Sequence, residues 1–170
     1  MNNLHNCQER DELADEIMAG TTRSLAFRAL DDEDSLVRKH AIYLLSTNRD
    51  SADIDTFIHA LRDPVKEVRN QATHALAILG APASGKLIAL LQDSDWKVRY
   101  RAAEALGMMK MKEAGSPLIQ RLSDKNDHVR YMAVKALGEL GDDDAREYIR
   151  PCLHDTNPYV RKIAARILEK

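Results

Sequence analysis

The residues best suited to chemistry in this chain are Asp and Arg residues that recur at a fixed spacing. An Arg follows a Val in five copies, at intervals of 31, 30, 31 and 31 residues, and an Asp lies six residues before each Arg. Carboxylate and guanidinium form paired, charge-assisted hydrogen bonds, for which Arg is better suited than Lys. A residue pair that is present in every repeat most simply serves what every repeat must do, which is to stack on its neighbour. We therefore interpret the pairs as a structural ladder. In this ladder each Arg bonds an Asp at the turn of its own or the adjacent repeat. Its members are Asp32, Arg38, Asp63, Arg69, Asp93, Arg99, Asp124, Arg130, Asp155 and Arg161.

Motifs of catalysis and metal binding are missing from the sequence. There is no H-E-x-x-H, no phosphate-binding P-loop, no G-x-S-x-G and no C-x-x-C. His40 and His74 could approach each other across neighbouring helices, but two histidines without a nearby carboxylate or Cys make a poor metal site. The sequence therefore predicts a protein that is not an enzyme, with no catalytic residue, no metal and no cofactor.

The ladder belongs to a longer repeated frame. Counted from each Val, a Leu lies seven residues before, an Asp five before, an Ala four after and a Leu eight after in all five copies. A fixed period near thirty is typical of a stacked-repeat solenoid, in which each repeat contacts only its neighbours. The frame is anchored by Val37, Val68, Val98, Val129 and Val160.

Two helices are predicted in each repeat. After the Asp, apolar residues fall on one stripe of a helical wheel, so this second helix should face the core. Asp34, Asp95, Asn126 and Asn157 lie where its N-cap belongs, and Gly80 and Gly141 lie where it should stop. The helix before the Asp carries pairs such as Leu87-Ile88 and Leu118-Ile119, and Pro151 should kink the last of these helices.

The frame D-x-x-x-x-V-R-x-x-A-x-x-x-L, with Ala105-Leu106-Gly107 and Ala136-Leu137-Gly138, resembles the short HEAT-like repeats first named from phycobilin lyase subunits. The resemblance implies an all-α, right-handed α-solenoid of five two-helix HEAT-like repeats. The repeats form one domain over residues 21–170, and Leu13 and Ile17 suggest an N-terminal capping helix over residues 1–20.

Proteins built from this repeat include bilin lyases, deoxyhypusine hydroxylases, glycosylases of alkylated DNA bases and adaptors without catalysis. The hydroxylases are similar to one another through His-Glu pairs that hold two irons, and none of the six histidines here is followed by Glu. The glycosylases use several aromatic side chains and an Asp at a cleft, whereas this chain has one Trp. A bilin lyase has no further motif by which it could be tested.

Positions that vary between repeats are free of stacking, so function is sought there. The free arc of the second helix and the turn before it should line the concave surface, and they hold the only Trp and four of the five Tyr. Such side chains dominate interface hot spots, although some could instead fill gaps between repeats. The predicted partner-binding residues are Tyr43, Trp96, Tyr100, Arg101, Met108, Tyr131, Met132, Lys135 and Tyr159.

Charge on this surface differs from that of the whole chain, whose net charge is −2. The basic residues are Lys39, Lys66, Lys97, Arg101, Lys135, Lys162 and Arg166, and the acidic ones are Glu67, Glu104, Asp127 and Glu139. Their balance, 7 − 4 = +3, favours a protein or an acidic peptide as partner. The density of Lys and Arg on this surface is low for a nucleic-acid binder, which normally shows a strong basic stripe. We therefore predict a non-catalytic protein-interaction module. The alternatives are an accessory subunit of an enzyme such as a bilin lyase, or a nucleic-acid binder.

The remaining expectations concern location and assembly. No apolar run approaches the ~20 residues of a membrane span, and the first residues lack the apolar region of a secretory signal, so a cytoplasmic protein is expected. Cys7 and Cys152 should be free thiols, because they lie at opposite ends of the stack. Ile163 and Ile167 should be half-covered after the last repeat, which predicts a weak homodimer through residues 150–170.

Overall fold

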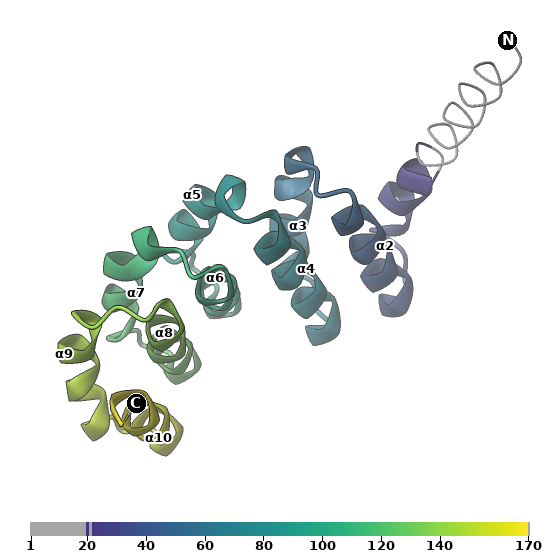
Figure 1. Ribbon diagram of the computed structural model, residues 1–170. Coiled ribbons are helices and arrows are strands. Elements are labelled where there is room, and N and C mark those ends of the chain that lie inside the picture. Colours follow the sequence, from purple (N-terminus) through teal and green to yellow (C-terminus); the bar gives the residue numbers. More distant parts are fainter. Residues whose placement is uncertain (1–19, 21, 170) are drawn as a thin grey trace, which may run out of the picture.

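The computed structural model describes residue 20 and residues 22–169, and every regular element in this part of the chain is helical. Paired helices stack side by side into a curved array, with one row inside the curve and the other outside (Figure 1). The inner helices are α2 (Ser35–Thr47), α4 (Lys66–Leu79), α6 (Trp96–Met109), α8 (Asp127–Leu140) and α10 (Pro158–Leu168). The outer helices span residues 22–29, α3 (Ile54–Ala60), α5 (Ala81–Leu90), α7 (Gly115–Arg121) and α9 (Ala145–Ile149). The predicted all-α solenoid is confirmed, and the predicted capping helix, residues 1–20, lies outside the described residues except for Gly20.

The inner helices begin where the capping residues predict. The side chains of Asp34, Asp95, Asn126 and Asn157 each accept a hydrogen bond from the backbone N–H two residues later. A side-chain oxygen at this position satisfies one of the N–H groups that the first turn leaves without a partner. Val65 stands at the same place before α4 and has no such oxygen, so α4 begins without a side-chain cap.

Three of the inner helices end at a residue with positive φ. Gly80 and Gly141 end α4 and α8 with φ of 68° and 67°, the conformation that Gly adopts without a steric penalty. Lys110 ends α6 in the left-handed region with φ of 52°, where a side chain is disfavoured. Pro151 acts as predicted in the last outer helix, because α9 stops at Ile149 and a 3-10 helix, Arg150–His154, carries the chain onward.

The core is a ribbon that runs through the stack between the two rows of helices. The repeated Val, Ala and Leu of the frame are buried in the middle of the array, as at Val98, Ala102 and Leu106. Val37 in the first repeat is partly exposed, and so is Leu153 in the last outer segment. The repeated apolar side chains are therefore fully buried only in repeats that have a neighbouring repeat on each side.

The last repeat differs from its prediction. Ile163 is 3% exposed and belongs to the core, so the expectation that it is half-covered was wrong. Ile167 packs against the core and lies over Gly138. The guanidinium of Arg146 donates to the Leu168 carbonyl at 2.6 Å, which satisfies one backbone oxygen at the end of α10. The prediction of a weak homodimer therefore keeps only one of the two exposed apolar side chains on which it was based. The homodimer stays a prediction.

Successive repeats are joined by Arg–Asp pairs, and we call each such pair a rung of the ladder. The guanidiniums of Arg38, Arg99 and Arg130 each donate twice to the Asp carboxylate of the next repeat, at 2.7–3.0 Å. The third nitrogen of each Arg donates to the backbone carbonyl of the Asp in its own repeat, at 2.8–2.9 Å. One side chain therefore fixes the turn before its own helix and holds the turn of the following repeat.

Each Asp of the rung also orders its own turn. The carboxylate accepts the backbone N–H two residues later in all five repeats, for example from Asn126 to Asp124 at 2.9 Å. Burial raises the pKa of the Asp124 carboxyl, but hydrogen bonds from Arg99 and from the Asn126 backbone outweigh burial and hold that pKa below its usual range. The Asp155 pKa is lowered mainly by its hydrogen bond from Arg130. These carboxylates are charged when the array is folded.

Arg99→Ala is expected to lower the free energy of unfolding by about 1–3 kcal/mol, because it leaves a buried carboxylate without its main donor. Asp124 keeps the Asn126 N–H and a longer contact with Arg121 at 3.5 Å, which limits the loss. Arg161→Ala is the matched control, because Arg161 occupies the same frame position and bonds only the carbonyls of its own turn. Urea unfolding measures both, and equal losses for the two variants would argue against the rung.

Stability should fall with acid in a defined window. A carboxyl whose pKa is lowered by folding contributes stability that is complete above its unfolded pKa, about 3.9, and that is lost as pH falls through the folded value. Wild type should therefore hold its free energy of unfolding above about pH 5 and lose it below about pH 4. Asp124→Asn should be less stable than wild type at neutral pH, and this gap should narrow in the acid window. A gap independent of pH would mean that the Asp124 charge contributes nothing to stability.

Gly107 and Gly138 occupy one frame position in neighbouring repeats but have different neighbours. A Cβ on Gly107 would lie 2.9 Å from both the Cα and the Cβ of Ala136, so α6 and α8 would have to separate. The three atoms nearest a Cβ on Gly138 would all belong to the side chain of Ile167, which can shift more easily than the backbone of a packed helix. Gly107→Ala should lower stability by about 1–3 kcal/mol despite better helix propensity, and Gly138→Ala should cost clearly less. Thermal melting of both variants tests this, and the reverse order would contradict it.

Candidate partner-binding surface

The aromatic residues predicted on the concave surface all lie on inner helices (Figure 1). Trp96 opens α6, Tyr100 lies one turn later, and Tyr131 belongs to α8; all three are half-buried. Tyr43 on α2 and Tyr159 on α10 are 54% and 71% exposed. The surface therefore has partly covered aromatic side chains at its centre and open ones towards both ends.

The central aromatic side chains are held in place by their neighbours. Trp96 stacks on the His128 ring, with 5.2 Å between ring centroids and 20° between planes. The Arg101 guanidinium lies 5.0 Å from the centre of the Tyr100 ring and donates to Glu104 at 2.5 Å. Burial, with a smaller effect of Glu104, raises the pKa of Tyr100, so its hydroxyl stays protonated near neutral pH. Side chains that are ordered before binding lose little entropy on contact.

A hollow of about 260 Å³ opens between α4 and α6 beside these rings. It brings together three predicted site residues, namely Trp96, Tyr100 and Arg101. The others that line it are Lys66, Arg69, Lys97 and His128. We call these seven residues the junction pocket.

Sequence reasoning missed part of the junction pocket for different reasons. Lys66 was placed on the concave surface by its charge but not among the partner-binding residues, although it occupies the same frame position as Trp96, one repeat earlier. His128 follows the N-cap of α8 and reaches Trp96 only because two repeats are stacked. Arg69 was assigned to the ladder with the other repeated Arg residues, and the signal in its own repeat is Arg62, whose frame position holds no Arg in the other four repeats.

Other predicted site residues lie outside the junction pocket. Met132 is 2% exposed and packs in the core, so its prediction as a surface residue was wrong. Its helical wheel placed it away from the helix's own partner, but α8 also packs against the inner helices α6 and α10. Met108 is exposed near the end of α6, and Lys135 pairs with Glu139 at 3.6 Å on α8.

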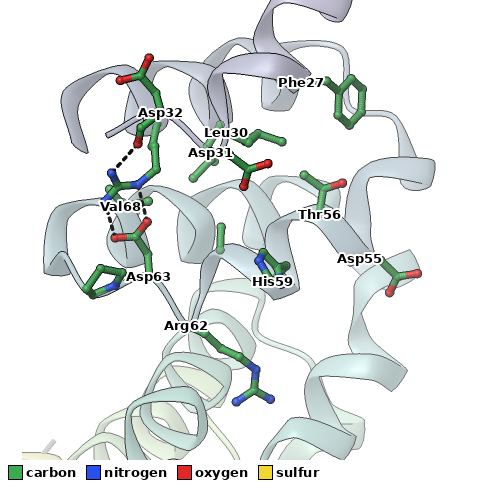
Figure 2. A pocket seen from close by; sticks show the side chains of 14 residues that line it. Phe27, Leu30, Asp31, Asp32, Asp55, Thr56, His59, Arg62, Asp63 and Val68 are labelled. Carbon is green, nitrogen blue, oxygen red and sulfur yellow. Dashed lines mark hydrogen bonds and ion pairs between the residues drawn. The ribbon is translucent and has the colours of Figure 1, made fainter. Parts of the chain in front are cut away.

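A larger hollow, about 860 Å³, lies between the outer helices of the first two repeats (Figure 2). Phe27, Leu30 and Asp31 lie on one side of it, and Thr56 and His59 lie on the other. Four charged residues on its wall are already in ion pairs: Asp63 with Arg38, Arg62 with Asp93, and Asp55 with Lys86. None of the predicted partner-binding residues lines it. We therefore place the candidate site on the concave surface.

Two negative findings apply to the described residues. Within residues 22–169, no group of three or more His, Cys, Asp or Glu side chains is placed to hold a metal ion. None of the helices in that range is both long and apolar enough to cross a membrane.

The comparisons with known proteins agree with the architecture. A phycocyanin lyase structure, the complex of CpcE and CpcF from Nostoc sp. PCC7120, is similar with a TM-score of 0.63 and 31% identity. The match covers 86% of this chain and 63% of that one, so this chain spans less than two thirds of the lyase chain's length. A designed armadillo repeat protein in complex with the peptide (KR)4 has a TM-score of 0.56 and 23% identity, over 94% of this chain and 85% of the design.

Human deoxyhypusine hydroxylase is similar at 17% identity with a TM-score of 0.53, over 86% of this chain and 72% of the enzyme. This likeness and that of the armadillo design show the fold alone. No curated protein sequence matches the chain. HEAT repeats match residues 22–87 and 84–169, which together cover most of the sequence. The chain belongs to the family of HEAT-repeat proteins.

Proposed function

We propose that this protein is a non-catalytic interaction module that holds a protein partner along the concave surface of its solenoid. The observation that carries the proposal is that Trp96 and Tyr100 line the junction pocket together and that Tyr131 lies close enough to Tyr100 to interact with it electrostatically. Tyr and Trp are the side chains most enriched in interface hot spots, and they lose few rotatable bonds when a partner covers them. Tyr159 extends this aromatic surface onto α10.

Charge on the concave surface favours an acidic protein segment over nucleic acid. Arg101 and Lys135 are paired with carboxylates of their own helices, which leaves fewer basic side chains of the concave surface for contact with phosphates. Nucleic-acid binders normally follow the phosphate backbone with a continuous row of Lys and Arg. Binding of single-stranded DNA whose affinity falls steeply with salt would favour the nucleic-acid alternative.

A second candidate function rests on the likeness to the phycocyanin lyase complex. At 31% identity and 86% coverage of this chain, the likeness supports an accessory subunit of a bilin-lyase-like enzyme. Such a subunit would act by assembling with another chain, so its concave surface would again be a protein contact. Co-purification with a second lyase-like subunit, together with transfer of a bilin to an acceptor protein, would favour this function over that of a general adaptor.

The test uses the partner recovered from the native lysate and then purified. The double variant Trp96→Ala/Tyr131→Ala should bind this partner at least about 30-fold more weakly, the loss of roughly 2 kcal/mol expected for hot-spot side chains. Tyr148→Ala is the matched control, because Tyr148 is exposed on the outer helix α9 and should leave binding unchanged. Isothermal titration calorimetry gives the dissociation constants.

Two results would count against the proposal. Equal partner affinities of the double variant and the Tyr148→Ala control would show that the partner does not bind at the concave surface. A loss of stability of about 3 kcal/mol or more for either single alanine variant, as expected for a core deletion, would make these aromatics packing residues. Circular dichroism melting of Trp96→Ala and Tyr131→Ala separates that outcome from a true loss of binding.

A further inference from the structure

The rung between the second and third repeats is built differently from the others. Arg69 occupies the frame position of Arg38 and Arg99, yet its guanidinium donates only to the Asp63 and Pro64 carbonyls of its own turn, at 2.6 and 2.8 Å. The carboxylate of Asp93 instead pairs with Arg62, which follows α3. The Nε of Arg69 is buried and has no hydrogen-bond partner. An Arg that elsewhere joins two repeats is thus left without a carboxylate.

Two lysines beside Arg69 lack counter-charges as well. Among residues 22–169, no carboxylate lies within 4.0 Å of the Lys66 or Lys97 ammonium groups. Arg101, the fourth cation of the junction pocket, is neutralised by Glu104 at 2.5 Å. Three positive charges from two repeats therefore line one hollow, and none of them has an ion pair with a carboxylate within 4.0 Å, an arrangement that attracts an anion.

The dimensions of the junction pocket limit what it can hold. Its volume of about 260 Å³ is below the roughly 300–1,000 Å³ of pockets that enclose cofactors and drug-sized ligands. One side chain of a partner fits this space better than a cofactor does. Trp96 and Tyr100 offer aromatic surface to the uncharged part of such a side chain, and the stacking of Trp96 on His128 fixes that wall.

We propose that the junction pocket binds a single anionic side chain of the protein partner, either a carboxylate or a phosphorylated residue. This proposal rests on the proposed function and names the chemistry of its anchor. Arg69 and Lys66 would contact the anion from the second repeat and Lys97 from the third, so the anion joins the two repeats where no Arg69–Asp93 rung does. Planar guanidinium and flexible ammonium groups both serve carboxylate and phosphate oxygens.

Trp96 is the only Trp of the chain and lines the junction pocket, so its fluorescence reports binding there. Phenyl phosphate and phenylacetate serve as probes, each titrated at constant ionic strength into the full-length protein. We expect a saturable change in Trp96 emission. In Lys66→Gln/Lys97→Gln the affinity for the better probe should fall at least tenfold. Lys112→Gln/Lys125→Gln removes the same charge from exposed residues outside the pocket and should match wild type.

The two probes separate the sources of the anion. Tighter binding of phenyl phosphate indicates a phosphorylated side chain, and tighter binding of phenylacetate indicates an Asp or Glu. No saturable change with either probe overturns the proposal, and so does an equal response of the pocket variant and the control variant. Arg69→Gln provides a further variant, which should weaken the same probe while circular dichroism shows the helices intact.

Failure of the anion site is distinguishable from failure of the proposed function. If Lys66→Gln/Lys97→Gln binds the purified partner as wild type does, while Trp96→Ala/Tyr131→Ala does not, the anion site is refuted and the interaction surface stands. If the probes bind as expected but both double variants bind the partner with wild-type affinity, the pocket is an anion site and the concave surface is not where the partner binds.

Discussion

The buried rung between Arg and the Asp of the next repeat is the interaction on which the array depends. At Arg99 and Asp124 the two side chains are 5% and 3% exposed, so each charge has lost most of its water and relies on the other. The same carboxylate accepts the backbone N–H of Asn126, which caps α8, and the same guanidinium bonds the turn before α6. The start of a helix and the stacking of two repeats are therefore set by one pair of side chains. This coupling explains why neither residue varies along the chain.

Local chemistry explains which features the sequence could predict. The period of the frame, the capping residues, the Gly stops and the interruption at Pro151 each depend on a few neighbouring residues, and the structure contains all of them. Met132 was misplaced because a helical wheel describes one helix against one partner. In a solenoid each inner helix also touches the inner helices before and after it, so a position at the edge of the wheel is buried from the side. That contact is not encoded in the repeat's own pattern.

The junction pocket illustrates the same limit for the site. Trp96, Tyr100 and Arg101 were predicted because they depart from the frame, and the structure places them around one hollow. Arg69 obeys the frame and was therefore interpreted as structural. Its role changes because Arg62, a residue with no equivalent Arg in the other repeats, reaches Asp93 first. Arg62 and Arg69 compete for the Asp93 carboxylate through the tertiary structure. A search for residues that depart from the frame cannot reveal this competition at Arg69, because Arg69 matches the frame.

The substituted rung also has an energetic consequence for the whole array. Arg62 is 46% exposed, so its pairing with Asp93 is screened by water and contributes less than the buried rung at Arg99. Because the stability of a solenoid is close to a sum of terms between neighbours, the weakening stays at the junction of α4 and α6 and leaves the other junctions unchanged. An anion held by Arg69 and Lys97 would add a second link between the two repeats beside the exposed Arg62–Asp93 pair. Ligand binding and repeat stacking would then be coupled at this one junction, since any anion that binds the joined form more tightly must also stabilise it.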